Sequence, residues 1–106
     1  LSETAWKALH DHPVVAAMGT NKFTFTQGGV AHFAEPSQPS TSMERALNTG
    51  REGFYGWMGL GGSIFQWHPQ HCIGFGYVPT SLNFLDLVNE RGKTYQAEVL
   101  KCIDNL

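Results

Sequence analysis

The fold is decided by residues 53–78, which read GFYGWMGLGGSIFQWHPQHCIGFGYV. Three short apolar and aromatic runs in this stretch are separated by turn-forming residues, a pattern typical of consecutive β-strands. We expect strands at 53–58, 63–67 and 72–78. The residues His-Pro-Gln-His at 68–71 predict a turn, so the last two strands should pair as an antiparallel hairpin.

A second hairpin is predicted upstream. Residues 22–26 alternate with a period of two, which places Phe23 and Phe25 on one face of a strand. The turn is expected at the Gln-Gly-Gly of 27–29, and the chain should return through 30–33.

The segments on either side of this hairpin are less regular. Residues 14–18 are apolar but short, and both strand and helix remain open for them. The range 35–52 is predicted to be a loop, because its first eight residues hold two prolines and no apolar periodicity. One helical turn is expected inside it, at Met43–Leu47.

Helices are expected at both ends of the chain. At the N-terminus Ser2 can cap a short helix that His12 and Pro13 should stop. The range 80–106 is predicted to be a helical tail with an apolar stripe interrupted at Gly92. The stripe consists of Leu82, Leu85, Val88, Tyr95, Val99, Cys102, Ile103 and Leu106.

These elements predict one domain of the α/β (α+β) class, an antiparallel sheet flanked by N- and C-terminal helices. The 42% of hydrophobic residues is ample for a core. Charged residues make up only 15%, against about 25% in typical soluble domains. We therefore expect part of the surface to be covered by another chain or by the remainder of a longer polypeptide.

Composition also argues against several classes of partner. The net charge of −2 gives no basic surface for nucleic acid. No apolar run reaches the roughly 20 residues that span a membrane. Cys72 and Cys102 are too few for a disulfide framework, and we expect two free, buried thiols. The sequence leaves the compartment open.

The most unusual segment is 56–62, where four of seven positions are glycine. Such glycines suit a backbone that turns sharply or lets a ligand approach closely. The Lys and Ser/Thr of a P-loop are absent, and so is the G-x-G-x-x-G spacing of dinucleotide-binding folds. We therefore expect no nucleotide and no other cofactor.

The run from Gly56 to Pro69, continued through 73–78, resembles the last catalytic motif and the following hairpin of the β-lactamase-related superfamily. That superfamily includes class C β-lactamases, DD-peptidases and esterases. Its third motif is Lys-Thr-Gly or His-x-Gly, and in the esterase branch often Trp-x-Gly, which Trp57-Met58-Gly59 matches. The resemblance implies a β-lactamase/transpeptidase-like fold, of which residues 1–106 are the C-terminal segment.

The resemblance also implies roles for individual residues. The backbone N–H that follows the third motif, here that of Leu60, would be one of the two donors to the oxyanion. The substrate would lie along Trp57, Met58, Gly59, Gly61 and Gly62. Trp57 replaces a cation, which favours small neutral esters or amides over carboxylate-bearing substrates.

The nucleophile of this family is missing from the chain. No serine is followed by lysine three positions later, and no tyrosine begins a Tyr-x-Asn motif. We expect the chain to act with an N-terminal remainder of the same polypeptide, or with another chain. Two functions stay open: one part of a serine hydrolase, or a noncatalytic module descended from that fold that binds a ligand or partner.

Other arrangements of reactive residues carry less weight. His68, His71 and Cys72 lack a further cluster to complete a metal site, and we predict none. A Ser63–His68–Asp86 triad has no nucleophile elbow. The alternating aromatic residues of the last hairpin are expected to fill the core. They are Phe65, Trp67, Phe75 and Tyr77.

Overall fold

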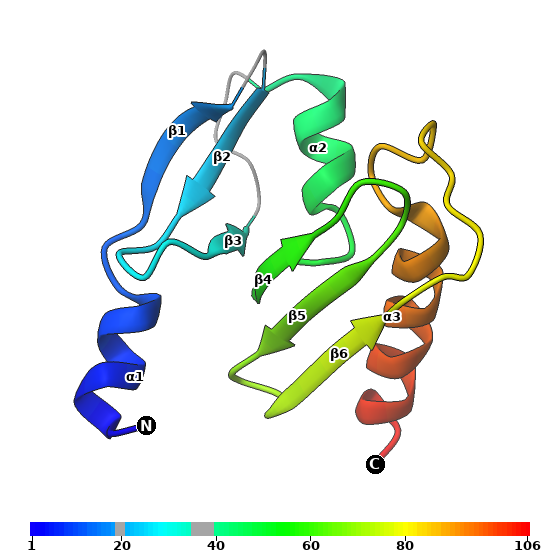
Figure 1. The fold of residues 1–106 in the computed structure, drawn as a ribbon. Helices are drawn as coiled ribbons and strands as arrows, with labels where there is room; N and C mark the ends of the chain where they lie inside the picture. Colours follow the sequence, from blue (N-terminus) through cyan, green and yellow to red (C-terminus); the bar gives the residue numbers. More distant parts are fainter. Residues whose placement is uncertain (19–20, 35–39) are drawn as a thin grey trace.

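The computed structural model describes residues 1–18, 21–34 and 40–106. These residues form an α+β fold with a six-stranded antiparallel sheet and three helices (Figure 1). The strands lie side by side in chain order, from β1 to β6. The elements are α1 (Glu3–His10), β1 (Val14–Met18), β2 (Asn21–Phe25), β3 (Ala31–Phe33), α2 (Ser42–Asn48), β4 (Phe54–Met58), β5 (Ile64–His68), β6 (Ile73–Tyr77) and α3 (Glu90–Asp104).

The three strands predicted within 53–78 are confirmed, with bounds that differ by at most one residue. β4 pairs with β5 from Tyr55 opposite Trp67 to Met58 opposite Ile64. β5 and β6 form the predicted antiparallel hairpin along all five residues of each strand. The glycine-rich segment 56–62 therefore comprises the end of β4 and, from Gly59 on, the turn that joins β4 to β5.

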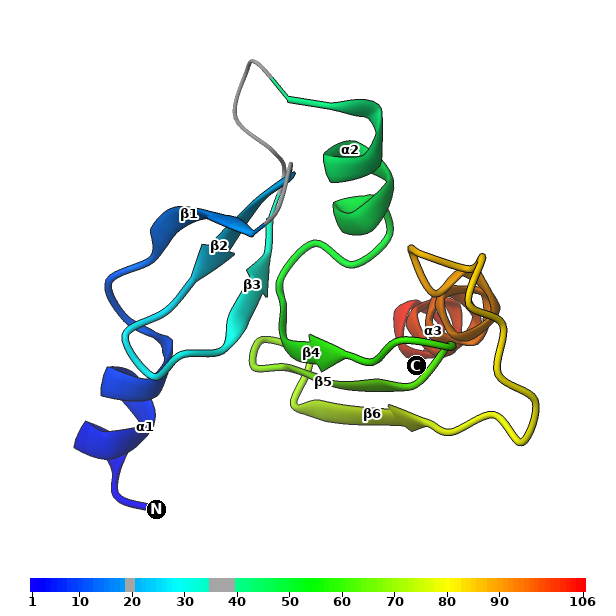
Figure 2. The ribbon, with the colours of Figure 1, turned by 45° about the horizontal axis from the view of Figure 1, so that its top comes forward.

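The N-terminal half of the sheet is built from a hairpin that the sequence left open. Residues 14–18 are a strand, which pairs with all five residues of β2. The predicted pairing of β2 with the 30–33 segment exists, but only Phe25 and Ala31 pair in register. β3 instead pairs over its full length with β4, which connects the two halves. Figure 2 shows the strong twist between them.

Helix α2 confirms the helical turn predicted at Met43–Leu47, within a range otherwise predicted to be a loop, and is one residue longer at each end. Its start is a capping box: Thr41 Oγ1 accepts from the Glu44 amide at 3.1 Å, and the Glu44 carboxylate accepts from the Thr41 amide at 3.0 Å. The same carboxylate accepts from the Lys22 amide of β2 at 2.9 Å, which ties α2 to the sheet. These backbone bonds, that from Lys22 first, lower the pKa of Glu44. The predicted loop at 35–39 lies outside the described residues.

Helix α3 begins later than predicted. Residues 80–89 are turns and irregular chain, and Leu82 and Leu85 are exposed. The reason is Asn89, whose left-handed backbone (φ 54°) cannot continue a helix from the preceding residues. The prediction that the helical tail starts near residue 80 was wrong.

The apolar stripe predicted for α3 is also wrong in part. The buried positions of the helix are Gly92 and Gln96, whereas Tyr95, Cys102 and Leu106 are exposed. A Cβ at position 92 would collide with the Ile64 side chain, so the helix approaches the sheet closest at this glycine. Close backbone approach, rather than large apolar side chains, fixes the position of α3.

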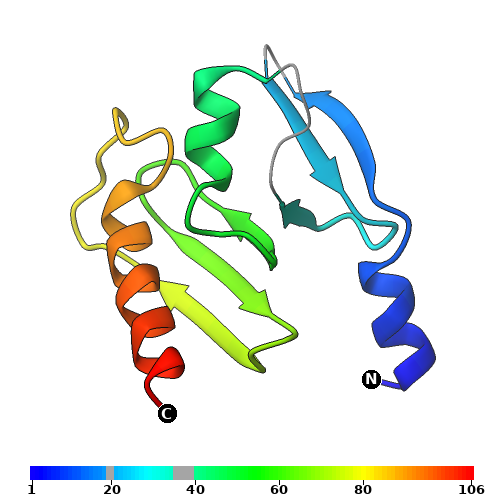
Figure 3. The same ribbon diagram turned by 180° about the vertical axis from the view of Figure 1, so that it is seen from behind.

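The core lies between β3, β4 and α3. Ala31, Phe33 and Phe54 are its buried centre, and Phe75 and Leu100 pack against them. Helix α3 covers one face of β4–β6, as expected for the C-terminal helix (Figure 2). Helix α1 lies on the other side of the molecule (Figures 1 and 3).

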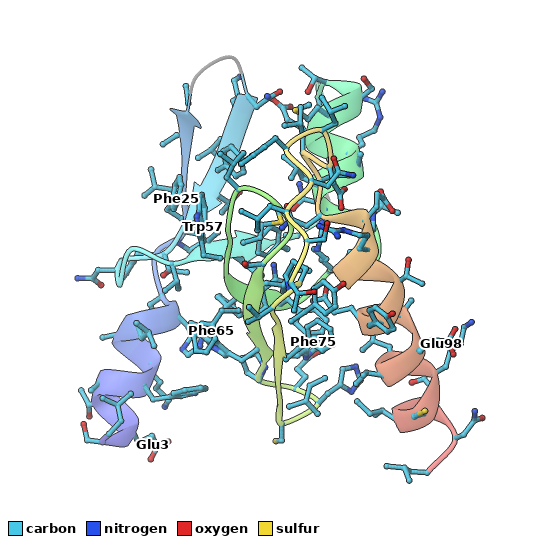
Figure 4. All side chains as sticks on the ribbon, turned by 45° about the vertical axis from the view of Figure 1, so that its right-hand side comes forward. Glu3, Phe25, Trp57, Phe65, Phe75 and Glu98 are labelled. Carbon is cyan, nitrogen blue, oxygen red and sulfur yellow. The ribbon has the colours of Figure 1, made fainter. Side chains whose placement is uncertain are left out.

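The face of β4–β6 turned away from α3 is only partly covered. Phe65, predicted to fill the core, has 72% of its surface exposed, because β5 points it away from the helix (Figure 4). Gly74 and Gly76 of β6 have nothing within 4 Å of their would-be Cβ positions. The prediction that the four alternating aromatics fill the core is therefore corrected: Phe75 packs against the core, Trp67 and Tyr77 are half-buried, and Phe65 is exposed.

Helix α1 is held to the sheet through His10. The indole N–H of Trp67 donates to His10 Nε2 at 2.8 Å, and His10 Nδ1 lies 2.7 Å from the carbonyl oxygen of Trp6. Because an indole is a donor only, Nε2 is the acceptor in this bond. The edge of this ring meets Tyr55, which stacks on His32.

We expect stability to fall as the pH is lowered from about 7.5 to about 5.5. Burial and the charge of His10 lower the pKa of His32; burial and His71 lower that of His68. Below the ordinary value of 6.5 the unfolded chain therefore binds more protons than the folded chain, and acid favours unfolding. Urea midpoints at several pH values measure this slope. His32→Gln with His68→Gln should flatten it, whereas the exposed-residue control His12→Asn should leave it unchanged. A slope unaffected by the double substitution would contradict the assignment.

Candidate functional site

The turn between β4 and β5 is a compact backbone loop. The Gly59 amide donates to the Ser63 carbonyl at 2.8 Å, and the Gly62 amide donates to the Gly59 carbonyl at 3.4 Å. Strand pairing ends at Met58 opposite Ile64, so Leu60 lies outside the ladder. Gly61 (φ 94°) and Gly62 (φ 125°) adopt backbone conformations that favour glycine, which explains why glycine occurs at these turn positions.

A hollow of about 380 Å³ opens beside this turn. Trp57, Met58, Gly59 and Leu60 line one part of it. Its volume is within the range of small-molecule sites, roughly 300–1,000 Å³. Side chains from β2, α2 and the segment before α3 complete the apolar lining. They are Phe23, Met43, Leu47 and Leu87.

Trp57 forms part of an aromatic group at this site. Its ring lies 5.8 Å from that of Phe23 and 6.0 Å from that of Phe25, measured between centroids (Figure 4). About 39% of the Trp57 surface is still exposed. Aromatic pairs at these distances restrict each other's orientation, so the Trp57 ring has a defined position in the wall of the hollow.

The polar side chains that line the hollow are bonded within the protein. Asn21 bonds to Met43 and Thr41. The Asp86 carboxylate accepts from backbone N–H groups in the first turn of α3, and Asn89 donates to two carbonyls of the glycine turn. The hollow therefore offers mostly apolar surface. No lysine or arginine lines it among the described residues, and its one acidic side chain is Asp86.

The Leu60 amide belongs to a residue that lines the hollow. Within the described parts of the chain it donates to no acceptor, since the bonds of the turn use the amides of Gly59 and Gly62. The Leu60 side chain is 72% exposed. A ligand carbonyl is the kind of group that such an N–H can bind.

The structure thus brings four of the six predicted site residues together at one hollow. Gly61 and Gly62 do not line it. They are buried in the turn, where added Cβ atoms would meet Leu82 and Arg91. Their place in the structure is to shape the backbone around Leu60.

A smaller hollow of about 210 Å³ lies on the other side of the same strand end. It shares Trp57, Met58 and Gly59 with the first and adds Phe65 and Val78. The end of β4 therefore has apolar hollows on both sides.

The sequence did not predict the residues whose side chains bind the carbonyls of the turn between β4 and β5, or those packed next to them. Asn89 and Arg91 bond to its carbonyl groups, and Arg51 is buried beneath the start of α3. All three have hydrogen-bonding side chains, but Arg51 lies in a segment predicted to be a loop, and Asn89 and Arg91 lie in the predicted helical tail. Nothing in the sequence indicated that Asn89 and Arg91 converge on the glycine turn, or that Arg51 binds the carbonyls just before α3.

The other candidate groups do not assemble. No group of three or more metal-ligating side chains occurs in residues 1–18, 21–34 and 40–106. Ser63 and His68 lie at opposite ends of β5, too far apart for a triad. Cys72 and Cys102 are free thiols but exposed, which corrects the prediction that they are buried. None of the described helices is both long and apolar enough to cross a membrane.

Comparisons with protein-family models, with curated proteins and with solved structures give no match for the chain. The chain has an α+β fold with an apolar hollow beside a glycine turn whose carbonyls are bound by Asn89 and Arg91.

Proposed function

We propose that the chain is the C-terminal part of a β-lactamase-related serine hydrolase that acts on ester or amide substrates by acyl transfer. One observation carries the proposal. The Leu60 amide lies outside the sheet ladder, at a turn bordering an apolar hollow lined by Trp57, Met58 and Gly59. These are the residues that match the third motif of that superfamily.

The role proposed for Leu60 is to stabilise the negative charge that develops on the substrate carbonyl oxygen. A preorganised donor of this kind contributes about 3–4 kcal/mol to acyl transfer. The serine that attacks the carbonyl is proposed to come from outside these 106 residues. Its hydroxyl oxygen adds to the carbonyl carbon while its proton passes to a base that is also outside these residues, and the oxyanion forms beside Leu60. The C–O or C–N bond then breaks, the alcohol or amine departs with that proton, and water hydrolyses the remaining acyl-serine.

The lining favours neutral substrates. A carboxylate entering the hollow would meet no lysine or arginine among the described lining residues and would lie near the charge of Asp86. An apolar acyl group would instead bury its surface against Trp57, Met58 and the apolar side chains opposite. We therefore expect esters or amides without a negative charge next to the reacting carbonyl.

Leu60→Pro should lower kcat for p-nitrophenyl ester hydrolysis by about 10²- to 10³-fold, because proline lacks the N–H that binds the oxyanion. The assay uses the polypeptide in which this chain is joined to the nucleophile-bearing part. Leu60→Ala is the matched control, since it trims the side chain and keeps the amide. Its kcat should change by less than about threefold.

Equal losses in the two variants, or full activity in Leu60→Pro, would contradict the oxyanion role. A fluorophosphonate probe should label the joined polypeptide but not the 106-residue chain alone. Labelling of the short chain would show that the nucleophile lies within it, against the proposal.

The second candidate is a noncatalytic module that uses the same hollow for binding. It is favoured by the lack of any Ser-x-x-Lys in the chain. The probe separates the two functions: a joined polypeptide that binds neutral esters, quenches Trp57 fluorescence and resists labelling is a binding module.

A further inference from the structure

Asn89 is placed and used in an unusual way for a residue at the start of a helix. It is the N-cap of α3, where an asparagine side chain normally accepts from the helix's own amides. Here it makes no such bond. That role passes to Asp86, whose carboxylate accepts from the Glu90 amide at 2.7 Å.

The Asn89 side chain is directed at the glycine turn instead. Its amide nitrogen donates to the carbonyl of Gly59 at 3.0 Å and to that of Ser63 at 2.9 Å. These two residues are where the chain leaves β4 and where it enters β5. Only 3% of Asn89 is exposed, and both partners are acceptors, so the bonds fix the orientation of the amide.

Arg91 holds the middle of the same turn. Its guanidinium donates to the Gly61 carbonyl at 2.7 Å and to the Ser81 carbonyl at 2.7 Å, and it lies 3.7 Å from the Asp86 carboxylate. A Cβ at Gly62 would lie 2.6 Å from this guanidinium, so the turn and the arginine fit closely together. The first turn of α3 thus binds three carbonyls of the 59–63 segment.

The consequence for Leu60 follows from the planarity of the peptide unit. The Gly59 carbonyl and the Leu60 N–H belong to one trans peptide and point in opposite directions. As long as Asn89 binds the carbonyl, the N–H points away from the Asn89 side chain. The Gly62 amide also donates to this carbonyl, but at 3.4 Å, so without Asn89 the peptide keeps only the longer bond. It can then rotate, since the glycine before Leu60 tolerates many backbone conformations.

We propose that Asn89 and Arg91 are positioning residues, which hold the Gly59–Leu60 peptide in the orientation that aims the Leu60 amide at the reacting carbonyl. The inference rests on the proposed acyl-transfer function, and it adds the residues that determine the orientation of the Leu60 N–H. Asn89 also lines the hollow, but its side-chain amide is bonded to the turn, so both residues are proposed to act on the substrate through the Leu60 peptide.

The first arm of the test uses the 106-residue chain alone. Asn89→Asp removes the donor without changing size, and Arg91→Lys keeps the charge but loses the fork of donors. We expect the ¹⁵N–¹H resonance of Leu60 to shift or split in both variants, and its hydrogen exchange to accelerate. Asn105→Asp and Arg45→Lys, at exposed positions, should leave that resonance unchanged.

The second arm measures hydrolysis by the joined polypeptide. Asn89→Asp should lower kcat about tenfold or more, towards the loss caused by removing an oxyanion donor, with KM within about twofold. Because both changes act through one N–H, Asn89→Asp with Leu60→Pro should be no slower than Leu60→Pro alone. Purely structural damage would instead multiply the two losses.

An unchanged Leu60 resonance, or losses that multiply, would overturn the positioning role. The joined polypeptide could lack hydrolase activity while the Leu60 resonance shifts as expected. In that case the proposed function is wrong, but Asn89 and Arg91 do fix the orientation of the Gly59–Leu60 peptide. The two proposals are therefore tested separately.

Discussion

Arg51→Met should lower the free energy of unfolding by about 3–5 kcal/mol. Arg51 has no exposed surface, and its guanidinium donates to the carbonyls of Leu47, Val88 and Asn89 at 2.7–3.0 Å and to Gln96 Oε1 at 3.3 Å. Methionine fills a similar volume but leaves these acceptors buried without a donor. Urea denaturation monitored by circular dichroism measures the loss.

The charge of Arg51 survives its burial. Desolvation lowers the pKa of Arg51 to about 10, against the opposing effect of Glu90 and Asp86, so the side chain is ionised near neutral pH. Arg45→Met is the control, because Arg45 is exposed on α2 and should change stability by no more than about 0.5 kcal/mol. Similar losses in the two variants would show that the buried bonds of Arg51 contribute little.

Gly56→Ala should destabilise the chain by about 3 kcal/mol or more. The residue has φ 129°, and a Cβ there would collide with the backbone carbonyl oxygen of Phe65 and lie 2.9 Å from Gln66 Cα. Backbone on the neighbouring strand cannot move aside as a flexible side chain could. The thermal midpoint and the urea midpoint should both fall.

Gly74→Ala is the matched control on the same sheet. Position 74 lies on β6, has nothing within 4 Å of its would-be Cβ, and does not have a positive φ. Stability should be unchanged or rise by up to about 1 kcal/mol, because alanine reduces the freedom of the unfolded chain. If both alanines cost the same, the close approach at Gly56 is not the cause.

Local sequence patterns predicted the strands well because their signals are short-ranged. The alternating residues of β4–β6 and the His-Pro-Gln-His turn determine where each strand begins and ends, and the structure follows them closely. Helix α2 has a further local signal that the prediction of a helical turn at Met43–Leu47 did not use, the Thr-x-x-Glu capping box at Thr41–Glu44.

The parts that could not be predicted depend on contacts between distant segments. The backbone of Asn89 is in the left-handed region, and its side chain binds a turn about thirty residues earlier in the chain. This conformation places the start of α3 at Glu90. Gly92 and Gln96 are buried because the helix backbone approaches Ile64 and because the Gln96 amide donates to Gln66 at 2.7 Å. An apolar periodicity cannot report a helix face that is fixed by glycine and glutamine.

The same limit applies to the candidate site. The sequence marked 56–62 as unusual because the glycines are adjacent in the chain. It gave no sign that Phe23, Met43 and Leu87 come from three separate segments to complete the hollow.

The arrangement of the six strands in chain order has a consequence for the rate of folding. Every strand pair joins neighbours in sequence, so the sheet consists of local loop closures, the kind of topology that folds quickly. The contacts of Arg51, Gln66 and the glycine turn with α3 span about thirty to forty-five residues, so we expect them to form later than the strand pairs. In a chain that emerges from the ribosome N-terminus first, we expect the sheet to precede the docking of α3, and the Leu60 peptide to acquire its final orientation at that step.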